Sequence, residues 1–175
     1  MNESLTAEEL KKLLRLEPHP REGGWFRQTW RTQESIPPDA LPARYTAARE
    51  AGRAAGTAIY YLLEPNTFSE MHRLASDEVF HFYLGDPVEM LQLLPNATGR
   101  RIVLGQNLAG DELPQTMVPH GVWQGSRLIP GGQFALLGCT VSPGFEYADY
   151  ESGKRSELML GWTEWAEFIN HLTNS

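Results

Sequence analysis

Short apolar and aromatic runs, separated by turn-forming residues, make up most of the chain. After residue 57 they are AIYYLLE, VFHFYLG, VEMLQLLP, RRIVLG, QTMVP, WQGSRLI and QFALLGCTV, divided by Pro, Gly, Asn or Asp. This pattern is typical of β-strands joined by short turns. The turns at 85–87, 96–99 and 130–132 are too short for crossover helices, so neighbouring strands are expected to be antiparallel. The regular spacing of these short runs predicts an all-β sandwich or barrel.

A short amphipathic helix is predicted within residues 1–18. Thr6 and Glu9 match a capping box, and Pro18 ends the helical pattern. The apolar positions at helical spacing between them are Leu10, Leu13 and Leu14. A helix with one such apolar face is expected to pack on the body of the protein.

A second helix is predicted at the other end, within residues 151–175. Thr163 fits an N-cap there. One helical face would carry Trp165, Phe168, Ile169 and Leu172. This helix is expected to close the domain.

The segment 19–150 between the helices is expected to form the barrel. HPREGG supplies turn residues, and WFRQTWR then predicts the first strand. Residues 33–56 are rich in Pro, Ala and Arg, which predicts a long connection and allows a short helix around 47–54. Such a connection is either a lid or a tolerated insertion. Together the three segments are expected to form one domain over 1–175.

Composition narrows the classes of function. The chain has 175 residues, which fits one domain, and a net charge of −7, which argues against nucleic-acid binding. It contains no apolar run near the roughly 20 residues that cross a bilayer, and its first residues lack the pattern of a signal peptide. A cytoplasmic protein is expected. The single cysteine, Cys139, lies in the apolar run FALLGCTV and is expected to be a small buried side chain.

The polar residues that could take part in a reaction are concentrated in residues 69–85, SEMHRLASDEVFHFYLG. His72 and Glu78 flank the turn-like LASD, so two strands could bring an imidazole and a carboxylate into one apolar cavity. Strand alternation places Phe80 and Phe82 on the same face as Glu78 and turns His81 away. The pattern predicts a small-molecule site in which His72 and Glu78 are the catalytic candidates.

The same stretch resembles the first motif of the cupins, G-x5-H-x-H-x3/4-E-x6-G. His72, Glu78 and Gly85 match it, while Leu74 stands in place of the second histidine and the opening glycine is absent. With EGGWFR, TAIYYLLEP and VPHGVWQ, the chain is similar over most of its length to a small cupin family catalogued as a conserved domain of unknown function.

The second cupin motif, G-x5-P-x-G-x2-H-x3-N, is matched in part. Pro119 and Gly121 fit it, Gln124 replaces its histidine and Leu128 its asparagine, and its opening glycine is also absent. The resemblance implies a double-stranded antiparallel β-helix, the jelly-roll barrel of cupins. It also implies a homodimer formed through sheet edges and terminal segments.

Two catalytic interpretations follow from the resemblance. In the first, His72, Glu78 and the amide oxygen of Gln124 bind one divalent transition metal, with Mn, Fe, Ni and Zn left open. In the second, His72 is a base that removes a proton beside a carbonyl, as in sugar-nucleotide epimerases that share the barrel. Glu78 would orient the ring, and the acid would come from Tyr60, Tyr61, Tyr147 or Tyr150.

The alternative is a binding or sensing module that performs no reaction. Its apolar wall would be formed by Phe80, Phe82 and Phe26, and its hydrogen bonds would come from His72, Arg73 and Gln124. His120 would sit at the barrel mouth. An enzyme of isomerase, epimerase or metal-assisted type, acting on a small sugar-like or keto substrate, is ranked first. No nucleotide cofactor, nucleic acid or membrane is expected as a partner.

Overall fold

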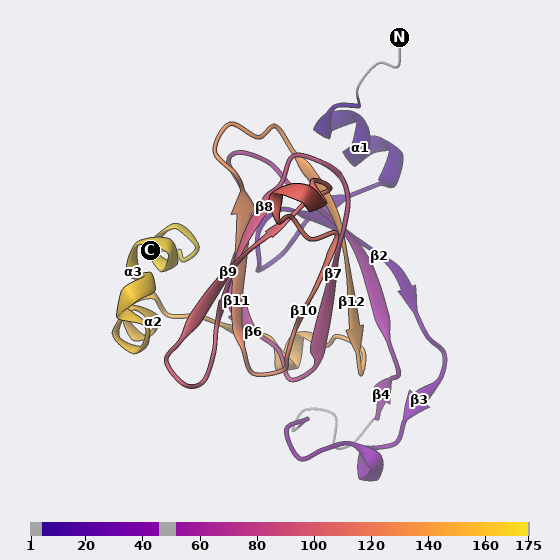
Figure 1. Cartoon of the computed structure of the whole chain (residues 1–175). Coiled ribbons are helices and arrows are strands. Elements are labelled where there is room, and N and C mark those ends of the chain that lie inside the picture. The colour runs from indigo at the N-terminus through magenta and orange to yellow at the C-terminus, as the bar shows by residue number, and fades with distance from the viewer. Residues whose placement is uncertain (1–4, 46–51, 175) are drawn as a thin grey trace.

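Two antiparallel sheets face each other and enclose the core (Figure 1). The computed structural model describes residues 5–45 and 52–174. One sheet has six strands in the order β1 (Glu17–Pro18), β2 (Trp25–Arg31), β5 (Thr57–Leu63), β12 (Ala135–Ser142), β7 (Asp77–Gly85) and β10 (Gln115–Val118). The other has five, in the order β13 (Glu151–Ser152), β6 (Phe68–Arg73), β11 (Trp123–Leu128), β8 (Val88–Leu93) and β9 (Gly99–Leu104).

The predicted all-β jelly roll is confirmed, and every pairing between these named strands is antiparallel. The short turns have two different roles, however. The turn at 96–99 joins β8 to its partner β9, whereas those at 85–87 and 130–132 carry the chain from one sheet to the other. Strands that follow each other across those two turns are therefore not neighbours, because a jelly roll alternates between its sheets.

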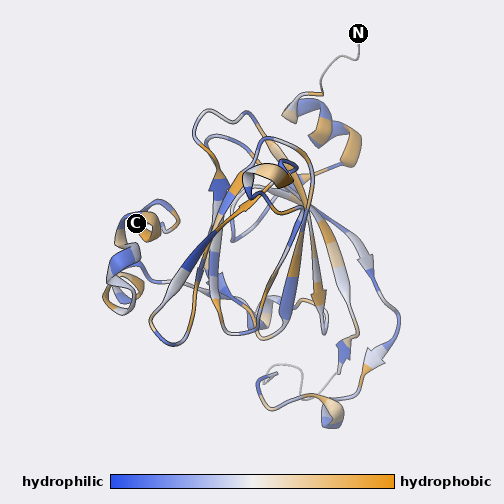
Figure 2. Cartoon of the chain, in the orientation of Figure 1, coloured by the Kyte–Doolittle hydropathy of each residue, from blue (hydrophilic) through white to orange (hydrophobic). Residues whose placement is uncertain are grey.

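The main core lies between the two sheets. Strand β7 alternates between buried and partly exposed positions, with Glu78, Phe80 and Phe82 buried and His81 half-buried on the outer face. Colouring by hydropathy shows apolar and polar residues interleaved along the strands (Figure 2). Phe80 and Phe82 belong to an apolar cluster with Tyr61, Leu137 and other core residues. Burial of such side chains contributes about 1.5–3 kcal/mol each relative to exposure.

The N-terminal helix α1 spans Ala7–Leu14. Its capping box forms as predicted, because the Thr6 hydroxyl accepts from the Glu9 backbone N–H at 3.3 Å and the Glu9 carboxylate accepts from the Thr6 N–H at 2.8 Å. Leu10 is buried against Leu62 and Leu136 of the six-stranded sheet. The helix therefore packs on the barrel as its apolar face predicts.

The C-terminal segment forms two short helices rather than the single helix predicted after Thr163. They are α2 (Arg155–Gly161) and α3 (Ala166–His171), joined by a 3-10 turn over Thr163–Trp165. Both pack on the outer face of the five-stranded sheet, against Met71 and Leu91 among others. The break lets the indole N–H of Trp162 donate to the Leu94 carbonyl at 3.0 Å, which fixes the turn on the sheet.

The connection after β2 contains β3 (Ser35–Ile36), which pairs with β4 (Arg53–Ala54), and a 3-10 turn over Pro38–Ala40. The short helix allowed around 47–54 lies mostly outside the described residues, and its last part forms β4. Arg53 is buried, pairs with Asp149 and lies 4.8 Å from the Tyr45 ring. Within the part of the chain that the structure describes, none of the helices has the length and apolar character needed to cross a bilayer.

Candidate functional site

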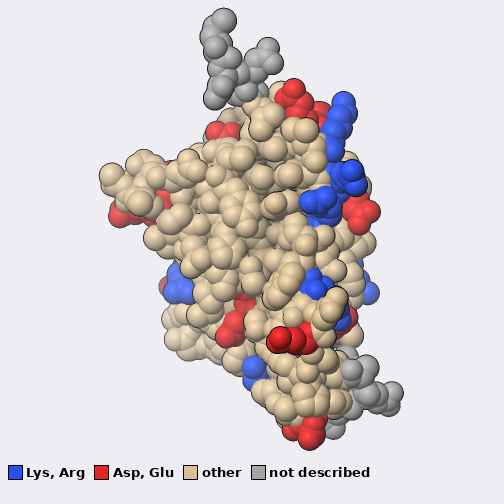
Figure 3. Space-filling view, turned by 90° about the vertical axis from the view of Figure 1, so that its right-hand side faces the viewer, with Lys and Arg blue, Asp and Glu red and all other residues tan. Residues whose placement is uncertain are grey.

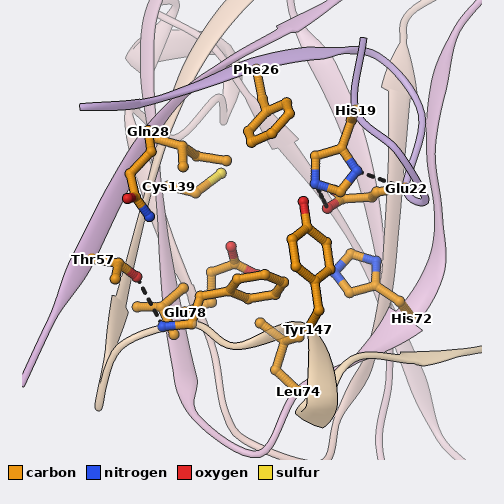
Figure 4. Close-up of a pocket in the computed structure, with 13 residues that line it drawn as sticks. His19, Glu22, Phe26, Gln28, Thr57, His72, Leu74, Glu78, Cys139 and Tyr147 are labelled. Atoms are coloured by element: carbon orange, nitrogen blue, oxygen red, sulfur yellow. Dashed lines mark hydrogen bonds and ion pairs between the residues drawn. The ribbon is translucent and has the colours of Figure 1, made fainter. Parts of the chain in front are cut away.

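A cavity of about 70 Å³ opens between the two sheets (Figure 4). Its polar lining comes from both sheets and from the loops before β2 and after β12, and consists of His19, Glu22, Gln28, His72, Glu78 and Tyr147. Its apolar walls are Phe26, Ile59, Leu74, Val141 and Phe145. The remaining lining residues are Thr57 and Cys139. The cavity therefore combines apolar walls with a few convergent polar groups, as small-molecule sites do.

His72 reaches the cavity because β6 bulges. Gln124 pairs with His72, but Ser126 pairs with Ser69, so β6 has one extra residue at this point. The Nδ1 atom of His72 lies 2.7 Å from the carbonyl oxygen of Glu70. A carbonyl can only accept, so Nδ1 carries the proton and Nε2 keeps its lone pair. In the described residues Nε2 has no hydrogen-bond partner, and it is free to bind a ligand proton.

The imidazole is held in place from behind by the C-terminal segment. The Tyr150 ring stacks on His72 at 4.9 Å between centroids, and its hydroxyl donates to Glu70 at 2.9 Å. The same carboxylate accepts from the Ser152 hydroxyl at 2.6 Å and from the Asn174 amide at 2.8 Å. This network fixes the bulge and therefore the direction of the His72 ring.

Glu78 enters from the opposite sheet and is 6% exposed. Its Oε2 accepts a hydrogen bond of 2.7 Å from the Gln124 amide. Burial raises the pKa of the Glu78 carboxyl to about 7, with the charge of Glu22 acting in the same direction and His72 and Gln124 opposing it. Near neutral pH this carboxyl can therefore either hold or release a proton.

Cys139 faces the same carboxyl from β12. Burial, and next the charge of Glu78, raise the pKa of its thiol well above the ordinary value. The thiol is buried and remains protonated, which agrees with its expected role as a small apolar side chain.

The loop over residues 19–24 brings in two residues that the sequence did not single out, His19 and Glu22. Glu22 is anchored on the bulge of β6, because its carbonyl accepts from the Glu70 N–H at 2.8 Å and its carboxylate accepts from the Ser69 hydroxyl. Gly23 has φ +98°, and a Cβ atom there would overlap the carbonyl oxygen of Phe68. Only glycine permits this close approach. The glycines of HPREGG were therefore the feature of the sequence that could have indicated that this loop packs against β6.

His19 is held by the same loop and its side chain is 4% exposed. Its Nδ1 accepts from the Glu22 backbone N–H at 2.8 Å, and its ring contacts Phe26 edge-on at 4.6 Å between centroids. Burial lowers the pKa of His19, so the ring is neutral near pH 7. In Figure 4 His19 and Glu22 lie on one side of the cavity and Glu78 on the other, with the Tyr147 hydroxyl directed toward His19.

Five of the predicted ligand-binding residues do not line the cavity, namely Phe80, Phe82, Arg73, His120 and Gln124. Phe80 and Phe82 fill the core, where alternation alone could not separate a cavity wall from packing. Arg73 lies on the outside, paired with Glu151 at 2.7 Å, and His120 is exposed beside Asp77 at 3.0 Å. Both are polar surface contacts of an ordinary type. Phe26, by contrast, is part of the apolar wall.

Gln124 lies behind Glu78 rather than in the cavity lining. Its Oε1 is buried and has no hydrogen-bond partner in the part of the chain that the structure describes. Of the four tyrosines considered as acids, Tyr147 lines the cavity. The Tyr61 and Tyr150 hydroxyls donate to Gly23 and Glu70, and the Tyr60 ring contacts the Tyr83 ring edge-on on the outer face.

The metal ligand set His72, Glu78 and Gln124 does not assemble. Gln124 turns its amide nitrogen toward Glu78, so its oxygen is not available beside the carboxylate. Leu74, in the place of the second cupin histidine, forms an apolar wall. Residues 5–45 and 52–174 contain no group of three or more His, Cys, Asp or Glu side chains placed to hold a metal ion. Two donors are fewer than a stable transition-metal site usually has.

Comparisons with known proteins agree with this architecture. The model of the family described as "Cupin superfamily (DUF985)" matches residues 8–153. The solved structure of protein SO0799 from Shewanella oneidensis is 30% identical with a TM-score of 0.84, over 98% of this chain and 99% of that one. A hypothetical protein from Leishmania major is 31% identical with a TM-score of 0.85, over 98% and 100%. An uncharacterized protein of Saccharomyces cerevisiae is 26% identical over 134 residues, 74% of this chain and 67% of that one.

Proposed function

The chain belongs to the DUF985 family of the cupin superfamily, and we propose that its barrel is the active site of an isomerase or epimerase that moves a proton at a carbon beside a carbonyl. One observation carries this proposal. The unprotonated Nε2 of His72 and the Glu78 carboxyl, whose pKa burial raises to about 7, reach one enclosed cavity from opposite sheets. A proton acceptor and a carboxyl that can hold a proton near neutral pH are what such a reaction requires.

The proposed step uses both groups. Nε2 of His72 takes the proton from the carbon, and the electron pair of that bond moves onto the carbonyl oxygen to form an enolate. The protonated Glu78 carboxyl then returns a proton to carbon from the opposite sheet, giving the inverted or shifted isomer. A proton passing from His72 to Glu78 through water restores the starting state. The small cavity has room for about five water molecules at roughly 15 Å³ each, so only a small head group of the substrate would be enclosed.

Hydrogen exchange with solvent tests this function directly. The protein in D2O is expected to exchange the hydrogen beside the carbonyl of a small uncharged keto or aldehyde sugar, followed by NMR. His72→Gln should abolish the exchange. Glu78→Gln should abolish formation of the inverted or shifted isomer, because exchange with retention can still proceed through His72, and His171→Gln on the exposed C-terminal helix should change neither. Because no metal takes part in the step, dialysis against EDTA should also leave it unchanged. Absence of exchange across a broad panel of keto and aldehyde compounds would exclude the reaction.

A ligand-binding or sensing role is the second candidate. Phe26, Val141 and Phe145 supply apolar walls that could hold a ligand without any reaction. Binding of a sugar-like compound without hydrogen exchange would favour this role over catalysis.

We further propose that the protein is a homodimer. Helix α1 covers the outer face of the six-stranded sheet at Leu62 and Leu136, and the rest of that face exposes apolar side chains, including Met117 at 47% and Tyr83 at 43%. Viewed from the side of β2, the central part of the surface is mostly uncharged, while Lys, Arg, Asp and Glu side chains gather along its upper right side (Figure 3). A second copy would cover such a surface and the short edge strands beside it. Light scattering on the eluting protein tests the mass in solution.

A further inference from the structure

The two cavity histidines hold their protons on opposite ring nitrogens. In His72 the Glu70 carbonyl fixes the proton on Nδ1, which leaves a lone pair on Nε2. In His19 the Glu22 N–H donates to Nδ1, so the neutral ring must carry its proton on Nε2. The cavity therefore presents one imidazole acceptor and one imidazole donor, each set by a backbone group.

The Nε2–H group of His19 donates no hydrogen bond within the described residues. Its nearest anionic atom, Oε2 of Glu22, lies 3.9 Å from Nε2, which is beyond hydrogen-bond distance. The ring itself is buried and wedged against Phe26. His19 lines the cavity, so an N–H group that has no acceptor among the described residues is available there to an acceptor on a ligand.

The charge of the cavity limits what that acceptor can be. The described residues that line it include the carboxyl groups of Glu22 and Glu78 but neither lysine nor arginine. The nearby guanidinium of Arg21 lies over the Tyr147 ring, 5.7 Å from its centroid, and is not part of the lining. A carboxylate or phosphate in the enclosed part would meet like charge with no compensating cation. An uncharged carbonyl oxygen meets no such repulsion.

We infer that His19 is a catalytic residue that donates its Nε2 hydrogen to the carbonyl oxygen of an uncharged α-hydroxy carbonyl substrate, whose hydroxyl group donates to the carboxylate of Glu22. This inference rests on the proposed function. When His72 removes the proton and the electron pair moves onto the carbonyl oxygen, the hydrogen bond from His19 strengthens and stabilises the developing charge. The lowered pKa of His19 fits this role, because a neutral imidazole donates without having to lose a positive charge.

Hydroxyacetone is the probe for this inference, with 1,2-propanediol and glycolate as matched compounds. The wild-type protein should bind hydroxyacetone more tightly than 1,2-propanediol, which lacks the carbonyl, and than glycolate, which is charged. Ligand-observed NMR measures the affinities. The stretching frequency of the ¹³C-labelled carbonyl should fall on binding, because it accepts a hydrogen bond.

Two substitutions of His19 separate its donor from its structural role. In His19→Asn the side-chain oxygen can still accept from the Glu22 N–H, but the donor at the Nε2 position is lost. This variant should keep the fold, weaken hydroxyacetone binding about tenfold, the size of one hydrogen bond, and lose the carbonyl frequency shift. His19→Gln places an amide N–H near the Nε2 position and should recover part of the shift.

The outcomes distinguish this inference from the proposed function. A frequency shift unchanged in folded His19→Asn, equal binding of glycolate, or no binding of hydroxyacetone would each overturn the assignment of His19 and of the substrate class. Binding and a shift that depend on His19, without any solvent exchange at carbon, would overturn the proposed reaction and leave the role of His19 in ligand binding intact.

Discussion

The side-chain amide of Gln124 lies 2.7 Å from the carboxylate of Glu78 and joins the two sheets of the barrel beside the cavity. Gln124 stands on β11, opposite His72 on β6, where the cupin motif has a metal-binding histidine. The amide nitrogen of Gln124 donates to the Glu78 carboxylate, and the buried amide oxygen has no hydrogen-bond partner in the described residues. The position that would hold a metal therefore lowers the proton affinity of Glu78 instead, against the larger effect of burial.

Replacing Gln124 by leucine should raise the pKa of Glu78 further. The amide hydrogen bond favours the charged form of the carboxyl and opposes the effect of burial. Leucine has a similar size and cannot donate, so Gln124→Leu should move the titration of Glu78 above about 7. NMR of ¹³C-labelled glutamate carboxyls measures this. Gln133→Leu, at an exposed position, is the control, and an unchanged or lowered pKa in Gln124→Leu would contradict the assigned role.

The Glu78 carboxyl should also make stability depend on pH. Its pKa rises from 4.5 to about 7 on folding, so its contribution is full below pH 4.5 and is lost as the pH rises through 7. The corresponding loss is about 3 kcal/mol in the free energy of unfolding, at 1.36 kcal/mol per pKa unit. Glu78→Gln, which cannot ionise, should remove this loss.

Urea unfolding at pH 5 and pH 8 measures the difference. The wild-type protein should lose more stability between these values than Glu78→Gln does. Glu157→Gln, at an exposed position on α2, should behave like the wild type. If Glu78→Gln kept the whole pH dependence, another group would have to be responsible.

The strands were the part of the fold that the sequence predicted best. WFRQTWR forms β2 over Trp25–Arg31 as expected, because its aromatic and β-favouring residues act locally. The strands predicted on either side of LASD would bring His72 and Glu78 into one cavity, and both residues line it. The C-terminal helix forms as α3, but the sequence did not predict α2 before it or the turn between the two, where Trp162 contacts Leu94, far away in the sequence.

The residues that line the cavity could not be predicted from local sequence patterns, because contacts between distant parts of the chain bring them together. His19 enters it because the backbone of Glu22 bonds to Glu70, 48 positions further along the chain. The bulge that turns His72 inward is bonded to the C-terminal segment, where Met71 donates to the Leu172 carbonyl at 2.7 Å. Phe80 shares a face with Glu78 yet lies deeper, in packed core. Strand alternation identifies the face of a side chain and not its depth.

Tyr150 should act as a positioning residue for His72. Its ring stacks on the imidazole, whereas its hydroxyl binds Glu70, so two substitutions separate the two contacts. Tyr150→Phe keeps the stacking and should retain most of the proton exchange. Tyr150→Leu removes it and should lower the rate of exchange with little effect on ligand affinity.

The ¹⁵N chemical shifts of His72 report its tautomer directly. They should remain those of an Nδ1–H ring in Tyr150→Phe and should average toward both tautomers in Tyr150→Leu. Equal exchange rates in the two variants, with an unchanged His72 signal, would show that the stacking contact is not needed.

Phe80 should act through packing rather than ligand contact. It is buried in the cluster that includes Val118 and Leu137, so Phe80→Ala should lower the free energy of unfolding by about 3–5 kcal/mol. Leu160→Ala on α2, where the leucine is exposed, should change it by less than about 0.5 kcal/mol. Urea unfolding measures both variants. A small loss of stability in Phe80→Ala, together with a large loss of hydroxyacetone affinity, would instead place Phe80 in the ligand wall.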